Sequence, residues 1–205
     1  MEYVIYVGDT ETTGTEPLIH DIIELSLWRS SDDSQKTWLI KAVNIQEIQE
    51  KALTVNKHKR EDIVHNTKFG RETYMDPAEA IIDIENWILE DDVSVEDRAF
   101  VGQNPDFDIK FMKAFWDRQG SKDTFPFGSF VLDTLLITRL IDLVIGKKRK
   151  YYNLGKLVKS FGITKGKAHK ASEDVRMTKD LFFKQLEPLK EVIKENFSDC
   201  YPDEE

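Results

Sequence analysis

VIYVGDTETTG, residues 4–14 of a 205-residue chain, runs apolar for four residues, meets a glycine and then places Asp9 and Glu11 around one threonine. Val, Ile and Tyr favour strands, so the stretch begins as a predicted buried strand. Residues two apart in a strand project to the same face, so both carboxylates can be offered to one point. Two close carboxylates repel unless one is protonated or a cation neutralises them. Hard divalent cations prefer such oxygen ligands, so a bound metal is one way in which the chain could accommodate this pair.

A pair of acids this close is by itself weak support for a metal, because the chain carries 38 Asp and Glu residues. The segment NPDFDIKFMKAF, residues 104–115, adds a third acid. Its apolar residues recur at helical spacing, and Asp108 falls between the apolar flanks near the predicted helix N-terminus. Asp106 lies in the first turn, where an acid complements the helix dipole, so Asp108 is the better ligand candidate.

A fourth acid lies in HKASEDVRMTKDLFF, residues 169–183. Asp174 shares a helical face with Ala171, Thr178 and Leu181. A carboxylate on a face directed at the core needs a partner or a metal. His169 precedes Asp174 by five residues, and a histidine with a pKa near neutrality can act as a general base.

Length and composition predict one globular domain. No apolar run approaches the roughly 20 residues of a membrane span, and residues 1–9 lack the basic and apolar regions of a signal peptide, so we expect neither. The chain has a single cysteine, Cys200, which fits a reducing, cytoplasmic location.

Charge is distributed unevenly along the chain. The net charge of −9 argues against generic polyanion binding, which Lys and Arg drive. Residues 143–172 nevertheless contain nine basic residues and no acid. This segment is either a solvated basic face or a local polyanion site.

The remaining patterns predict strands in a meander, followed by alternating strands and helices. Residues 21–43 predict a hairpin, residues 76–89 a helix after the N-cap Asp76, and residues 99–104 a short strand. Asn104 and Pro105 are expected to begin a helix that Gly120 ends, and Asp133 to mark the junction of a strand and a helix. A last helix over about 172–186 is expected to break or kink at Pro188. The order predicts an α/β fold with a mixed sheet flanked by helices.

Three segments together resemble the exonuclease motifs of the DnaQ-like, or DEDDh, 3′→5′ exonucleases: DTETTG (9–14), VGQNPDFD (101–108) and HKASED (169–174). DTLLITR (133–139) and LGKLVKSFGI (154–163) resemble the segments between the motifs. The likeness covers most of residues 3–187. It implies a ribonuclease-H-like fold, a five-stranded mixed β-sheet flanked by α-helices. Many members carry His where this chain has Gln103.

The resemblance also implies a function. Asp9, Glu11, Asp108 and Asp174 would hold two divalent ions, Mg²⁺ or Mn²⁺, and His169 would activate the attacking water to release nucleoside 5′-monophosphates from a 3′ end. Three further residues, Thr12, Thr13 and Gly14, would approach the terminal nucleotide through their backbone. The basic segment 147–170, with Lys167, would bind and guide the strand, and Tyr151 or Tyr152 would be its stacking platforms. Single-stranded DNA is the favoured substrate and RNA the alternative, and a polymerase partner and the oligomeric state stay open.

Two other functions stay open at this point. A ribonuclease-H-like endonuclease also uses clustered acids on this sheet, although the histidine before the last acid argues against it. A binding module could keep the fold without catalysis, although all five expected residues are present. We expect residues 1–187 to form the exonuclease domain and residues 188–205 a C-terminal helix and acidic tail.

Overall fold

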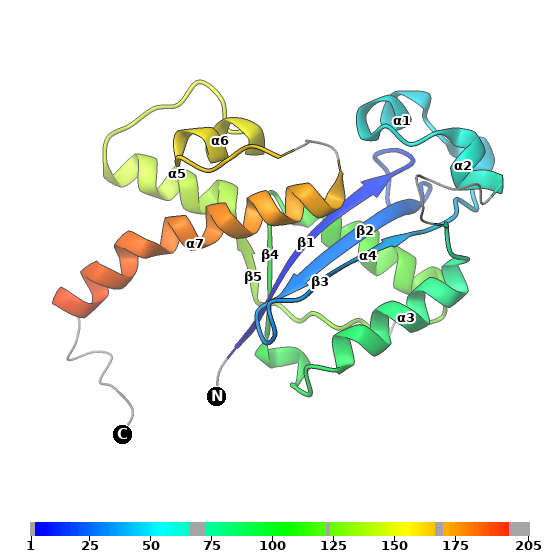
Figure 1. Cartoon of the computed structure of the whole chain (residues 1–205), viewed down its shortest axis with the longest axis horizontal. Helices are drawn as coiled ribbons and strands as arrows, with labels where there is room; N and C mark the ends of the chain where they lie inside the picture. The colour runs from blue at the N-terminus through cyan, green and yellow to red at the C-terminus, as the bar shows by residue number, and fades with distance from the viewer. Residues whose placement is uncertain (1–2, 66–72, 122–123, 167–169, 197–205) are drawn as a thin grey trace.

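The computed structural model describes residues 3–65, 73–121, 124–166 and 170–196. At its centre lies a five-stranded sheet with the order β3-β2-β1-β4-β5 (Figure 1). Its strands are β1 (Val4–Thr12), β2 (Ile22–Arg29), β3 (Gln35–Leu39), β4 (Arg98–Gly102) and β5 (Val131–Asp133). The first three strands are antiparallel neighbours, whereas β4 runs parallel to β1 and β5 parallel to β4. The expected mixed sheet of five strands is confirmed.

Helices cover both faces of the sheet (Figure 1). They are α1 (Glu50–Asn56), α2 (Arg60–His65), α3 (Pro77–Leu89), α4 (Asp106–Arg118), α5 (Thr134–Val144), α6 (Leu154–Ser160) and α7 (Ala171–Asn196), with 3-10 turns at Ile45–Glu47 and Val95–Asp97. Among the described residues no helix is long and apolar enough to cross a membrane.

The alternation of β1 divides its side chains between two cores. Tyr6 packs with residues of α3 and α4, such as Ile84 and Phe111. Val7 packs on the other face with Val175 and with Phe182 of α7. Odd-numbered residues of β1 therefore face α7, and even-numbered ones face α4.

The parallel partner of β1 stops early. Pairing with β4 ends at Val7 opposite Val101, whereas pairing with β2 continues to Thr12. The last third of β1 thus has a neighbouring strand on one side only, and this open edge lies where the acidic residues begin.

Two sequence expectations about helix ends were wrong. The last helix does not break or end at Pro188 but continues through it to Asn196. Proline fixes φ near the helical value and costs one hydrogen bond, which is tolerable because residues 187–190 are exposed to water. The expected boundary between residues 187 and 188 therefore falls inside α7. Asn104 does not cap α4: it has a φ of 62°, and the helix begins at Asp106.

Candidate metal and nucleotide site

Three of the predicted ligands converge at the end of the sheet. Asp9 and Glu11 project from β1 toward α7, and Asp174 lies in the first turn of α7. The three side chains each offer one carboxylate oxygen, and these atoms lie within 4.8 Å of one another. Each of the three residues is half-buried. Figure 1 shows why they meet, because the N-terminus of α7 lies against the C-terminal end of β1.

Asp108 reaches this region from the other face of the sheet. It is 5% exposed, and its Oδ1 accepts hydrogen bonds from the backbone N–H of Thr10 at 2.9 Å and from the Thr10 hydroxyl at 2.7 Å. The N–H of Thr10 is available because β4 no longer accompanies β1 at this point. The structure thus brings Asp108 beside the strand that carries Asp9 and Glu11, but outside the group of three converging carboxylates.

Burial and like charge make these acids unusually weak. The pKa of Asp9 is raised well above its ordinary value, first by burial and then by the charges of Asp108 and Glu11. Burial raises the pKa of Glu11 to about 8, with Glu24 the largest charge contribution. The pKa of Asp108 is raised to about 7 by burial, and the two hydrogen bonds from Thr10 oppose that rise.

This donor set fits a hard divalent cation. The atoms are carboxylate oxygens, which Mg²⁺ and Mn²⁺ prefer over nitrogen or sulfur. A cation placed among Asp9, Glu11 and Asp174 would offset the mutual repulsion that raises the pKa of the first two. The residues present therefore fit the metal that the sequence predicts.

A cavity of about 430 Å³ opens beside Glu11. Its lining comes from the end of β1 and the following loop, from α1 and the residue before it, and from Phe107, which contributes an aromatic ring. It is lined by Thr10, Glu11, Thr12, Gly14, Thr15, Gln49, Lys51, Ala52, Val55, Asn56 and Phe107. A concave space with an aromatic ring next to clustered carboxylates has the features of a nucleotide site.

The backbone of Thr12–Gly14 is largely engaged within the protein. The carbonyl of Thr12 accepts from Asn56 Nδ2 at 3.0 Å, and the N–H of Thr13 donates to the carbonyl of Asp21. The Thr12 hydroxyl donates to the carbonyl of Gly14 at 2.6 Å. Thr12 and Gly14 line the cavity, whereas Thr13 is fully buried, so the first two are the better placed to meet a ligand.

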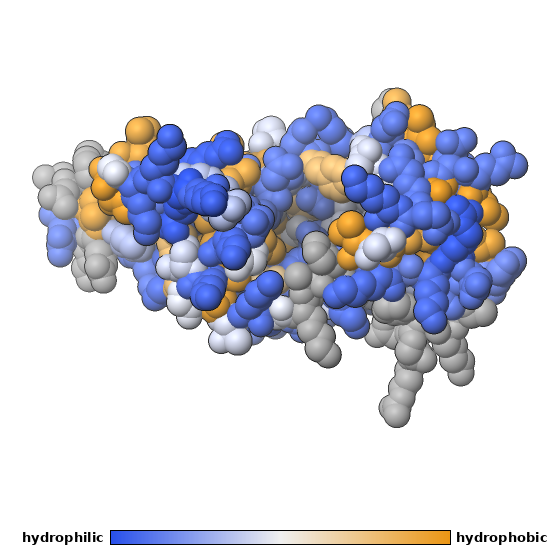
Figure 2. Space-filling model, turned by 90° about the horizontal axis from the view of Figure 1, so that it is seen from above, coloured by the Kyte–Doolittle hydropathy of each residue, from blue (hydrophilic) through white to orange (hydrophobic). Residues whose placement is uncertain are grey.

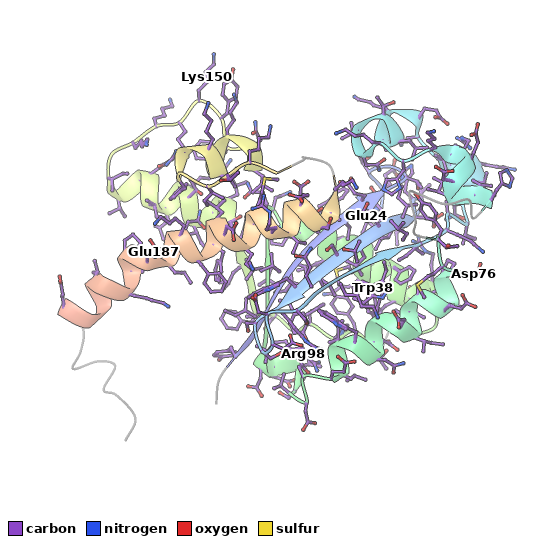
Figure 3. All side chains as sticks on the ribbon, in the orientation of Figure 1. Glu24, Trp38, Asp76, Arg98, Lys150 and Glu187 are labelled. Atoms are coloured by element: carbon purple, nitrogen blue, oxygen red, sulfur yellow. The ribbon has the colours of Figure 1, made fainter. Side chains whose placement is uncertain are left out.

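The face that carries this site is hollowed between two lobes, and its rim is mainly hydrophilic (Figure 2). One lobe bears α5, α6 and the basic loop between them, from which Lys150 projects into solvent (Figure 3). Tyr151 is half exposed, and the Nζ atom of Lys150 lies 5.2 Å from the centre of its ring. Lys167 and His169 lie outside the residues that the structure describes.

Gln103 holds this lobe to the sheet. Its Oε1 accepts from the Thr134 hydroxyl at 2.6 Å, and its Nε2 donates to the carbonyl of Tyr152 at 3.1 Å. At the position where many members of the resembled family carry His, this chain therefore has a side chain that ties the start of α5 to the loop before α6.

The sequence did not predict a row of three buried, hydrogen-bonded side chains next to the site. Glu24 of β2 lies opposite Glu11 in the strand register. His58 bridges Glu24 and Tyr74, with distances of 2.9 Å from Nε2 to Glu24 Oε2 and 2.6 Å from Nδ1 to the Tyr74 hydroxyl. In the sequence, Glu24 alternates with apolar residues as a solvated strand residue does, and His58 lies in a polar stretch. The one available signal was that Glu24 lies in a strand expected to pair with the strand of Glu11.

Comparison with known proteins gives a family and a fold. A family model described as Exonuclease (RNase_T) matches residues 6–182. The PolC-type DNA polymerase III of Staphylococcus aureus strain bovine RF122 / ET3-1 is 29% identical over 192 residues, which are 93% of this chain and 12% of the polymerase. The chain therefore spans about an eighth of the length of the curated relatives that it matches.

Solved structures of exonuclease I share the fold. The zinc-bound form of an E. coli exonuclease I complex with single-stranded DNA superposes with a TM-score of 0.75 at 17% identity, over 95% of this chain and 42% of that chain. An exonuclease I from Methylocaldum szegediense gives a TM-score of 0.71 at 17% identity, over 95% and 41%. The expected ribonuclease-H-like fold is confirmed.

Proposed function

The chain belongs to the exonuclease family whose model covers residues 6–182, among the DnaQ-like 3′→5′ exonucleases, and from this membership we propose how it acts and on what. It hydrolyses the terminal phosphodiester bond at the 3′ end of single-stranded DNA and releases nucleoside 5′-monophosphates. The observation that carries the proposal is the convergence of Asp9, Glu11 and Asp174 beside a cavity of about 430 Å³.

The roles of the acidic residues follow from their chemistry. Asp9, Glu11 and Asp174, with Asp108, would hold two divalent ions, Mg²⁺ or Mn²⁺. When bound, such ions supply Lewis-acid stabilisation of charge on the reacting phosphate. Thr10 fixes the carboxylate of Asp108 through two hydrogen bonds, so that this acid does not rotate freely.

His169 is proposed as the general base that takes the proton of the attacking water. It precedes the first residue of α7 by two positions, and α7 carries Asp174 in its first turn. A base must lie within hydrogen-bond reach of the proton it takes, and a histidine retains useful basicity near neutral pH.

The cavity beside Glu11 is proposed to receive the terminal nucleotide. Phe107 supplies a ring on which a base can stack, and Thr12 and Gly14 line the space next to the acids. The basic loop with Lys150 and Tyr151, together with Lys167, would guide the preceding nucleotides. A polymerase is a proposed partner, because the curated relatives are PolC-type DNA polymerases.

The proposal is tested with oligonucleotides labelled at the 5′ end. Single-stranded DNA, single-stranded RNA and a mismatched duplex are incubated with Mg²⁺ or Mn²⁺, beside the Asp9→Ala protein. Stepwise shortening from the 3′ end, with mononucleotides as the product and no shortening by Asp9→Ala, is expected. Internal fragments would instead indicate an endonuclease, and metal-dependent binding of the strand without products would indicate a silent binding module.

A further inference from the structure

Glu24 lies on the same face of the sheet as the candidate metal ligands. It is the antiparallel register partner of Glu11, and directly opposed residues project to one face with Cβ atoms about 4.5–5.5 Å apart. Glu24 is 4% exposed. Figure 3 shows it at the end of the sheet where α7 begins.

His58 and Tyr74 fix this carboxylate in place. The side chain of His58 is fully buried, and its Nδ1 shares a hydrogen bond with the Tyr74 hydroxyl, which can donate or accept. The carboxylate of Glu24 accepts through Oε2 from His58 Nε2 at 2.9 Å. Both ring nitrogens of His58 therefore have a partner, and the orientation of the Glu24 carboxylate is fixed by the contact with Nε2.

The same segment is attached to the end of β1. Asn56 Nδ2 donates to the carbonyl of Thr12, and Asn56 Oδ1 accepts from the backbone N–H of His58 at 3.2 Å. The N–H of Gln49 donates to the carbonyl of Thr13 at 2.8 Å. The position of His58 relative to Glu11 is therefore set by hydrogen bonds on both sides of α1.

A buried carboxylate beside Asp9, Glu11 and Asp174 repels their negative charges unless an acid is protonated or a cation is present. In a site with little water, the electrostatic interaction between two charges stays strong over several ångströms. Glu24 would therefore attract a cation bound at Glu11 without coordinating it.

We propose that Glu24, oriented by His58 and Tyr74, is a positioning residue that strengthens divalent-cation binding at Glu11 as a fixed neighbouring charge. This inference rests on the proposed metal-dependent function. It assigns Glu24 no contact with substrate.

The test is Mn²⁺ binding to the Glu24→Gln protein, measured by isothermal titration calorimetry and by the electron paramagnetic resonance signal of free Mn²⁺. Glutamine keeps the shape and an acceptor for His58 but removes the charge. We expect the dissociation constant for Mn²⁺ to rise about tenfold and the gain in melting temperature on adding Mn²⁺ to shrink. A dissociation constant within about twofold of wild type would overturn the inference.

Glu85→Gln is the matched control. Glu85 of α3 accepts from Trp116 Nε1 at 3.0 Å and from the Thr124 hydroxyl at 2.6 Å, so it is also a hydrogen-bonded acid but belongs to the other layer. It should leave the affinity for Mn²⁺ unchanged. An equal loss in both variants would mean general loosening of the fold and would contradict the inference.

Glu24→Asp provides a second reading, because it keeps the charge but shortens the side chain. Its affinity for Mn²⁺ should stay closer to wild type than that of Glu24→Gln. If the glutamine variant fails to fold, Glu24→Asp decides alone: a loss of about tenfold or more contradicts a role for the charge.

Nucleotide release by the wild-type protein is measured separately. If wild type binds Mn²⁺ and this binding depends on Glu24, but no nucleotide is released, the proposed function fails and the inference about the cation holds. If wild type releases nucleotides and Glu24→Gln binds Mn²⁺ as tightly as wild type, only the inference fails.

Discussion

Thr10 and Asp108 are 98 positions apart in the chain, yet the backbone N–H and the hydroxyl of Thr10 both donate to the same carboxylate oxygen of Asp108. The bond to the N–H exists because β4 separates from β1 after Val7, which leaves one edge of β1 without a neighbouring strand. Thr10 is thus more than a spacer between two acids. It ties the end of β1 to the first turn of α4.

Thr10→Val should weaken catalysis more than folding. The change removes the hydroxyl and keeps the branched shape, so Asp108 retains only the backbone hydrogen bond. Loss of one hydrogen bond to a charged acceptor costs about 1.5–3 kcal/mol, and if the loss appears in the transition state, turnover falls at least about tenfold. Release of nucleotides from a labelled single strand measures turnover, and urea unfolding measures stability. Thr10→Ser, which keeps the hydroxyl, should act like wild type.

The stability of the metal-free protein should fall as the pH rises. The pKa of Glu11 moves from 4.5 to about 8 on folding, so between these values the folded state binds more protons than the unfolded state. Stability is then highest below the unfolded pKa and is lost as the pH rises through the folded pKa. Urea unfolding in EDTA from pH 5 to 8 should show this decline, and Glu11→Gln should make it shallower. An identical slope in both proteins would contradict the raised pKa.

Phe107→Ala should weaken substrate binding. The ring lines the cavity beside Glu11, and stacking of a base on an aromatic ring contributes about 1–3 kcal/mol, so KM should rise about tenfold. Phe107→Tyr keeps the ring and is the matched control. Steady-state kinetics with a short single-stranded oligonucleotide measures KM. An unchanged KM for the alanine variant would show that the terminal base lies elsewhere.

His169→Gln should slow the chemical step and spare metal binding. General-base catalysis contributes about 10²–10⁴-fold, so turnover at neutral pH should fall by at least about 10²-fold. Affinity for Mn²⁺ should not change, because the carboxylates are intact. His65→Gln, an exposed histidine at the end of α2, is the control and should keep full turnover. Normal turnover in His169→Gln would remove the general-base role.

Asp91→Ala should destabilise the fold without affecting the chemistry. Asp91 forms a buried ion pair with Arg98 at 2.6 Å and accepts from the Tyr6 hydroxyl at 2.6 Å. Removing the acid leaves an uncompensated guanidinium, which costs about 3–5 kcal/mol of unfolding free energy. Glu96→Ala, an exposed neighbour, should cost little. Urea unfolding makes the comparison, and turnover below the unfolding transition should match wild type. Figure 3 shows Arg98 at the end of the sheet away from Glu24.

Some of this site could be predicted from local periodicity. Alternation along a strand is enough to put Asp9 and Glu11 on one face, and helical spacing is enough to align Asp174 with the buried Ala171 and Thr178. Each of these patterns involves neighbours in the chain, whose relative positions are fixed once the type of element is known. The metal ligands and the general base stay predictions.

Other features depended on how elements pack. Glu24 faces Glu11 only through the register of β1 and β2, and His58 reaches Glu24 only because the segment around α1 folds back onto the strand end. The continuation of α7 through Pro188 also depended on the surroundings of that turn. Because the turn is exposed to water, the loss of one helical hydrogen bond costs less there.

The sequence alone determined that this chain builds a strand ending in two carboxylates, followed by helices that each carry one more acid, because strand and helix periods are local properties. Only the tertiary structure decided that Asp9, Glu11 and Asp174 converge, whereas Asp108 is hydrogen-bonded to Thr10 outside that group. That outcome depends on where β4 leaves β1, which is a matter of long-range pairing that no local period encodes. The open edge this creates is what gives Asp108 its hydrogen bond from the Thr10 backbone.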